Sequence, residues 1–342
     1  MALTAEKTQN QFSPYLDIQG KLAPAFNPND LCKEWVIEWL AENSYEKDAE
    51  RISSCGLKAI SLKCANGHQK IVRTTCHKEI CPRCGQKGSL AHKKRYLRAL
   101  DRLLWSDVLG YIVFTLPREV SDLMPDKKQL SKIEKKAVQI VRDNFNTPGC
   151  MARAHFMGEE IEHLHLHINV LFPITDTNGR GEVPQTTLQE IRKQWTEFIN
   201  KTFNLNKDIT NIFYKFATSP VKMRHKIKYV TRSVVVAEKF LSLSNEAKHW
   251  YLALAGWHNT RWYGQLANCK YKEYLKEQGL DFIAHREEDI ALAKKCPVCG
   301  ERYKYQEQIN VEDIPRSQFH RIDKDVWVDL ETYAILKNKA SP

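Results

Sequence analysis

Three histidines alternate with apolar residues in one short run of this chain, HLHLHINV, which extends from His163 to Val170. Successive side chains of a β-strand point to opposite faces, so His163, His165 and His167 would share one face. The apolar residues between them would pack into a core on the other face. The run therefore predicts a half-buried strand whose polar face carries a site.

Three imidazoles on one strand face are more typical of a metal site than of histidines bonded within a core. A divalent ion held this way keeps open coordination positions, which suits Lewis-acid work on a phosphate. A further ligand should come from the neighbouring strand. His155 is the first candidate there, and Glu159 and Glu160 are the alternatives.

A tyrosine among cationic side chains is the second candidate for chemistry. Tyr229 lies close in sequence to Lys226, Lys228 and Arg232. A tyrosine, with a reference pKa near 10, is a poor nucleophile at neutral pH unless cations or a metal-polarised electrophile lie nearby. Both are expected here, and the alternative is that Tyr229 simply packs in a core or an interface.

The helix that would carry this tyrosine begins at a clear signal. Ser219 is suited to the N-cap position and Pro220 to the first helical position. We therefore expect a helix from Val221 to about Ala237, with Tyr229 near its middle.

Cysteines cluster early in the chain, where Cys81-Pro-Arg-Cys84-Gly85 resembles a zinc knuckle. In a reducing compartment, ten clustered cysteines indicate metal binding rather than disulfides. Cys64 and Cys76 would complete a structural four-sulfur zinc site with Cys81 and Cys84. The competing ligands are His68 and His77, and Cys55 could displace Cys64.

A second pair with the same spacing, Cys296 and Cys299, lies near the end of the chain. This pair predicts a second zinc site, but the sequence offers no obvious second pair of ligands for it. The candidates to complete it are Cys269, His258 and His320. An unmetallated turn and a site shared with the first module are the alternatives.

The charge of the chain favours a polyanionic partner. The formal net charge is +11 and the sequence pI is about 9.0, which makes nucleic acid the first candidate. A basic helix expected over residues 89–104 offers Lys93, Lys94, Arg95 and Arg98 for phosphate contacts. The alternative for this helix is an ordinary solvated face.

The pattern along the 342 residues predicts an α+β protein whose core is an antiparallel sheet flanked by helices. We expect strands at 110–117, 150–158, 163–172, 209–216 and 261–264, and helices at 31–40, 126–146 and 188–203. The expected regions are a helical lead-in (1–50), a zinc module with the basic helix (51–105), the sheet domain (106–240) and a mainly helical C-terminal region (241–342). No apolar run approaches the ~20 residues of a membrane span, and we expect an intracellular, cytoplasmic protein.

The order of these motifs resembles that of the HUH endonucleases, named for histidine–hydrophobic–histidine. The likeness rests on the strand ending at Pro117, on the histidine run, and on Tyr229 followed by Arg232, and it covers roughly residues 55–300. The family includes rolling-circle replication initiators, relaxases and single-strand transposases. The cysteine module, the Arg261-Trp-Tyr-Gly264 segment and the late cysteine pair are similar to zinc-binding rolling-circle transposases and related replication proteins.

The resemblance implies a defined chemistry. His165 and His167 match the family's metal-binding pair for Mg²⁺ or Mn²⁺, and His163 matches an extra leading histidine of uncertain role. Tyr229 matches the nucleophile, which attacks single-stranded DNA and leaves a 5′-phosphotyrosine and a free 3′-hydroxyl. Lys226, Lys228 and Arg232 would lie beside the DNA. The chain departs from members with two catalytic tyrosines, since residues 225 and 233 are His225 and Ser233.

The expected function is therefore replication initiation, by nicking and joining single-stranded or hairpin DNA at the origin of a plasmid or phage. The partners implied are that DNA and host replication proteins such as a helicase and a polymerase. One alternative is a rolling-circle transposase with the same chemistry. The other is a non-catalytic, zinc-dependent DNA-binding protein in which the histidine strand is a structural metal site.

Overall fold

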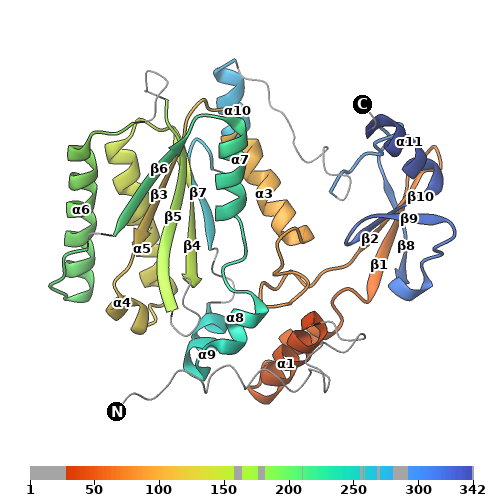
Figure 1. Cartoon of the computed structure of the whole chain (residues 1–342), viewed down its shortest axis with the longest axis horizontal. Helices are drawn as coiled ribbons and strands as arrows, with labels where there is room; N and C mark the ends of the chain where they lie inside the picture. The colour runs from red at the N-terminus through yellow and green to blue at the C-terminus, as the bar shows by residue number, and fades with distance from the viewer. Residues whose placement is uncertain are drawn as a thin grey trace, which may run out of the picture.

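The computed structural model describes residues 28–157, 164–175, 182–209, 211–254, 257, 259–267, 270–279 and 292–340. Two five-stranded antiparallel sheets with helices around them make up this part of the chain (Figure 1). The α+β prediction is therefore confirmed. Residues 158–163, which hold His163, Glu159 and Glu160, lie outside the described residues, as do His258 and Cys269.

The large sheet has the strand order β6-β3-β5-β4-β7. Its strands are β3 (Leu109–Thr115), β4 (Gly149–Met157), β5 (Leu164–Pro173), β6 (Ile212–Ala217) and β7 (Thr260–Gly264). The histidine strand β5 is central, and His167 on it pairs with Thr115 of β3 on one side and with His155 of β4 on the other. The expected strands are thus present in an antiparallel sheet.

Helices cover both faces of the large sheet (Figure 1). They are α3 (Leu90–Leu103), α4 (Arg118–Asp122), α5 (Lys127–Asn144), α6 (Gln185–Phe203), α7 (Pro220–Val230) and α10 (Lys270–Glu277). Buried residues of α5 and α6 pack with Ile168 and Val170 on one face. Buried residues of α3, α7 and α10 pack with Tyr111 and Leu171 on the other. Strand alternation thus places the odd-numbered residues of β5, His165 and His167 included, on the α7 side.

Below the large sheet lie α1 (Pro28–Glu42), α8 (Ala237–Ser242) and α9 (Asn245–Ala253), and α2 (Glu46–Ser53) follows α1. Trp39 of α1 packs edge-on against Phe240 of α8, with ring centroids 5.3 Å apart. This contact joins the N-terminal helix to the core of the large sheet, which includes Val36, Leu40 and Phe240.

The small sheet joins two distant parts of the chain, in the order β8-β1-β2-β10-β9. Its elements are β1 (Lys58–Lys63), β2 (Gln69–Arg73), β8 (Lys304–Asn310), β9 (Phe319–Asp323) and β10 (Val326–Asp329), with the short 3₁₀ helix η2 (Val311–Asp313) and the final helix α11 (Leu330–Ala340). The zinc module expected at 51–105 is therefore completed by C-terminal strands. The C-terminal region, expected to be mainly helical, contains α9, α10 and α11, but it also contributes β8, β9 and β10 to the small sheet and the expected strand β7 to the large one.

The tyrosine helix is shorter than expected. Ser219 caps α7 as predicted, accepting a hydrogen bond from the Lys222 amide, but the helix ends at Val230. The expected helix to Ala237 is thus wrong. Thr231 occupies the C-cap, its hydroxyl donates to the Ile227 carbonyl, and a non-helical segment follows before α8 begins at Ala237. Tyr229 consequently lies in the last turn.

Candidate functional site

Four cysteine sulfur atoms converge in the first of two groups that could hold a metal ion such as zinc. Cys55, Cys76, Cys81 and Cys84 place their sulfur atoms within 4.8 Å of one another, and all four are buried. We call this group the inner cluster. Within this cluster, the hydrogen bond between Cys55 and Cys81 lowers the pKa of the Cys81 thiol. A thiolate is the form of cysteine that binds zinc.

The second group, which we call the outer cluster, consists of Cys64, His68, Cys296 and Cys299. The Cys64 sulfur lies 3.6 Å from the Cys299 sulfur and 3.4 Å from Nδ1 of His68. Nε2 of His68 faces a carboxylate oxygen of Glu331 at 3.9 Å. A carboxylate behind the second ring nitrogen is the usual outer-shell partner of a metal-binding histidine.

The two clusters correct the predicted ligand sets. Cys64 does not join Cys76, Cys81 and Cys84, because the turn between β1 and β2 carries it to the far end of the small sheet; Cys55 takes its place, one of the alternatives weighed from the sequence. The pair Cys296 and Cys299 is completed by Cys64 and His68. His77 belongs to neither group, and among the described residues His320 does not either.

The histidines of the large sheet form a third group of different geometry. The rings of His165 and His167 lie 5.5 Å apart, and those of His155 and His167 lie 5.3 Å apart. Nδ1 of His167 lies 3.0 Å from the His165 carbonyl oxygen, a contact that favours a proton on Nδ1. In that tautomer Nε2 carries a lone pair that can bind a metal ion. Among the described residues, two groups bring at least three candidate ligand atoms within 4.8 Å of one another, and both are the cysteine clusters. The described histidines of the large sheet do not form such a group, so a catalytic ion here stays a prediction.

Burial favours the neutral form of His155 and His167. It lowers the pKa of His167 to about 4, and it lowers the pKa of His155 well below its usual value. Neutral imidazole is the form that binds a metal. Nε2 of His155, however, lies 3.1 Å from the Val230 carbonyl, so this ring fastens β4 to the end of α7. This contact engages Nε2 of His155, and its role as a ligand of the catalytic ion stays a prediction.

Tyr229 lies over the same face of the sheet as His167. Its ring packs edge-on against Tyr111, 6.5 Å between centroids, and the Tyr111 hydroxyl donates to Asn169, two residues beyond His167. Arg232 stacks on the Tyr229 ring at 4.2 Å, and its Nη2 donates to the phenol oxygen at 3.2 Å. Tyr229 is 40% exposed, so a large substrate can reach its hydroxyl.

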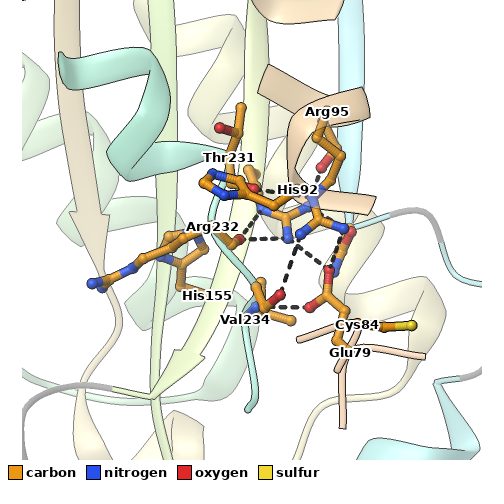
Figure 2. A network of polar contacts seen from close by, with 12 residues as sticks. Glu79, Cys84, His92, Arg95, His155, Thr231, Arg232 and Val234 are labelled. Carbon is orange, nitrogen blue, oxygen red and sulfur yellow. Dashed lines mark hydrogen bonds and ion pairs between the residues drawn. The ribbon is translucent and has the colours of Figure 1, made fainter. Parts of the chain in front are cut away.

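A set of cationic and imidazole groups holds the end of the tyrosine helix and the segment directly after it (Figure 2). Arg95 Nε donates to the Thr231 carbonyl at 3.0 Å, and Arg153 Nη2 donates to the Arg232 carbonyl at 2.8 Å. His92 faces the Lys228 carbonyl at 3.3 Å. These groups satisfy carbonyls that a helix end leaves without intrahelical partners, and positive charge there complements the helix dipole.

Glu79 connects this segment to the inner cluster, two residues before Cys81 (Figure 2). One of its oxygens lies 2.9 Å from Arg153 and 3.3 Å from Arg95, and the other accepts from the Val234 amide at 2.7 Å. Burial opposes the charge on Glu79, yet the two guanidinium groups hold its pKa below the usual value. The inner cluster and the tyrosine segment are thus joined through the partly buried carboxylate of Glu79.

The predicted phosphate-binding residues divide into two sets. Lys93 forms an ion pair with Asp323, and Arg95 is engaged by Glu79 and Thr231, so both serve internal contacts rather than an exposed phosphate surface. Lys94 and Arg98 on α3 are exposed, as are Lys228 and Arg232. Lys226 lies over the Tyr111 ring at 5.1 Å.

Glu79, Arg153 and Asn169 are site residues that the sequence reasoning missed. Arg153 is fully buried in a strand, and an arginine inside an apolar strand is a signal that could have pointed to a buried partner. Glu79 gave no comparable signal, because its two arginines lie far from it in sequence.

Comparisons with protein-family models, curated proteins and solved structures find no match to this chain. No helix in the described part of the chain is both long enough and apolar enough to cross a membrane.

Proposed function

We propose that this chain nicks and joins single-stranded DNA through Tyr229, as an initiator of rolling-circle replication. The observation that carries the proposal is the placement of Tyr229, Arg232 and the histidines of β4 and β5 on one face of a five-stranded antiparallel sheet. The resemblance to the HUH endonucleases supplies the reaction, and the net charge of +11 suits a polyanionic substrate.

In the proposed reaction the Tyr229 oxygen forms a bond to the scissile phosphorus while the bond from phosphorus to the 3′-oxygen breaks. The phenol proton is lost and the departing 3′-oxygen takes up a proton, so a 5′-phosphotyrosine and a 3′-hydroxyl result. Arg232, 3.2 Å from the phenol oxygen, stabilises the negative charge that develops as the proton leaves. Joining is the reverse reaction with a second 3′-hydroxyl.

His165 and His167 are the residues that would hold Mg²⁺ or Mn²⁺, through a free Nε2 on His167 and the exposed ring of His165. Such an ion, when bound, would withdraw charge from the phosphate oxygens. The inner and outer clusters are proposed to hold structural Zn²⁺, since four protein ligands leave no open position.

The test is formation of a covalent protein–DNA adduct. The protein is incubated with Mg²⁺ or Mn²⁺ and labelled single-stranded oligonucleotides, both of random sequence and from the DNA flanking its gene, and denaturing gels then reveal the adduct. The wild type should form it and Tyr229→Phe should not. Tyr305→Phe is the matched control, because Tyr305 is exposed on β8 of the small sheet.

His165→Ala and His167→Ala should abolish the adduct and leave DNA binding mostly intact. Absence of any adduct from the wild type, or an adduct that survives Tyr229→Phe, would overturn the proposed reaction. DNA binding without an adduct would instead favour the non-catalytic DNA-binding protein.

A further inference from the structure

A basic groove of about 760 Å³ runs along the solvent-facing side of α5. Its cations are Lys127, Lys128, Lys132, Lys135, Lys136 and Arg261. No carboxylate is among the described residues that line it. The lysines of α5 thus share a groove wall whose described residues carry no carboxylate, while Arg261 lies 3.8 Å from the buried carboxylate of Glu134.

The groove continues toward the C-terminal end of the helix. A second hollow of about 510 Å³ shares Lys135 and Gln139 with it and extends to Arg142, beside Asp143. From Lys128 to Arg142 the helix rises about 21 Å, at 1.5 Å per residue. A single strand stacked as in duplex DNA, at 3.4 Å per nucleotide, would place about six phosphates along this length, and a more extended strand would place fewer.

The spacing of the lysines disfavours the helix itself. Lys128, Lys132 and Lys136 follow one another at intervals of four residues, and like charges in that arrangement repel one another and destabilise the helix. Glu134, the acidic residue between them, is fully buried and bonded to Tyr263. Glu134 lies behind the groove wall, 3.8 Å from Nε of Arg261, and does not separate the lysines from one another. A bound polyanion would relieve the repulsion among these lysines.

Two half-buried aromatic rings belong to the same groove. Lys132 lies 5.7 Å from the Phe198 ring, and Arg261 lies 5.5 Å from the Trp257 ring. The Trp257 indole donates to the Ser131 hydroxyl at 3.1 Å, and Arg261 donates to the same hydroxyl at 3.0 Å. These bonds fix Trp257 at the wall of the groove before any ligand arrives.

We propose that this groove is a binding site for single-stranded nucleic acid, separate from the tyrosine site. Cations that follow a backbone, together with aromatic rings on which unpaired bases stack, are the combination that binds single strands without reading their sequence. The groove lies on the α5 side of the large sheet and Tyr229 on the α7 side. It thus goes beyond the proposed nuclease function and holds strand that is not being cut.

The experiment measures binding of fluorescein-labelled oligo(dT) of about 16 nucleotides, a length within the usual site size, by fluorescence anisotropy over a series of salt concentrations. All proteins carry Tyr229→Phe, so strand cleavage does not contribute and the result stands whatever becomes of the nuclease proposal. The groove variant is Lys128→Gln/Lys132→Gln/Lys135→Gln. The matched control is Lys193→Gln/Lys201→Gln/Lys270→Gln, which removes the same charge from exposed lysines outside the groove.

The groove variant should bind roughly tenfold more weakly, and its slope of log affinity against log salt should fall by about 2, since each phosphate contact contributes about 0.7. The control should change little. Phe198→Leu should weaken binding roughly fivefold without changing the slope, because it removes stacking and no charge.

Equal weakening of both triple variants would overturn the proposal, because the effect would then follow net charge alone. Polyglutamate and vesicles containing phosphatidylserine serve as competitors. Displacement of the oligonucleotide by either one at equal charge concentration would also overturn it, and would identify an acidic protein or a lipid surface as the partner.

Discussion

The inner and outer clusters each contain a pair of cysteines with the same two-residue spacing, but their ligands span different lengths of the chain. The inner cluster draws its ligands from Cys55 to Cys84, and every sulfur is buried. The outer cluster joins Cys64 to Cys299, 235 residues later, and Cys299 is only partly buried. The inner cluster thus organises a local module, whereas the outer cluster fastens one end of the small sheet.

Their surroundings differ in a way that bears on function. The residues around the inner cluster reach the tyrosine segment through Glu79 and the small sheet through Arg83, which donates to Asp325 at 2.9 Å. The outer cluster contacts Glu331 of α11 and lies on the small sheet. Disturbing the inner cluster should therefore affect both stability and chemistry, and disturbing the outer cluster should affect mainly the small sheet.

The largest expected effect is that of Cys81→Ser. Removing one ligand from a buried structural zinc site costs several kcal/mol, which corresponds to a fall of about 10 °C or more in melting temperature. Cys299→Ser should release one zinc ion as well, with a clearly smaller fall. Bound zinc is measured by mass spectrometry and unfolding by calorimetry. Equal falls for the two variants would remove the distinction between the clusters.

Glu79→Gln should be next in size. It leaves Arg153, which is fully buried, and Arg95 without their anion, and loss of one partner of a buried pair costs about 3–5 kcal/mol. The rate of adduct formation should fall with it, while zinc content stays unchanged. Lys78→Gln is the neighbouring control, since its partly exposed pair with Asp48, at 2.7 Å, is worth about 0–1 kcal/mol.

The contribution of Glu79 also depends on pH. The pKa of Glu79 in the folded chain lies below its ordinary value of 4.5. Its stabilising effect is therefore fully present above about pH 4.5 and is lost as the pH falls from there through the lower pKa of the folded chain. The difference in unfolding free energy between wild type and Glu79→Gln should shrink below about pH 4.5. A difference that stays constant down to pH 3 would show that Glu79 is not acting as a charged partner.

The two knuckle glycines should give the smallest effects and a sharper comparison. A Cβ at Gly85 would lie 2.0 Å from the Glu79 carbonyl oxygen, so Gly85→Ala must displace the backbone next to the carboxylate network, at about 3 kcal/mol. Gly300 has a φ of +75° and open space around it. Gly300→Ala should cost only roughly 1–2 kcal/mol, for the left-handed conformation. Chemical denaturation measures both, and the reverse order would contradict the structure.

The sequence predicted local features better than distant pairings. Alternation fixed the face of His165 and His167, and Ser219 with Pro220 fixed the start of α7. The end of that helix depends on contacts with Arg95, Arg153 and His155. These residues belong to other elements, so the sequence around the helix could not predict where it ends. The predicted cysteine ligand sets were wrong for the same reason, because Cys64 and Cys299 are brought together by the pairing of β1 with β8.

The pairing of β2 with β10 has a consequence for the life of the newly made chain. At synthesis rates of about 5–20 residues per second, the 235 residues from Cys64 to Cys299 take about 12–47 s to emerge. During that time β1 and β2 have exposed edges that can pair with other chains. The ligands of the inner cluster are complete once Cys84 has been made, whereas the outer cluster must wait for Cys296 and Cys299.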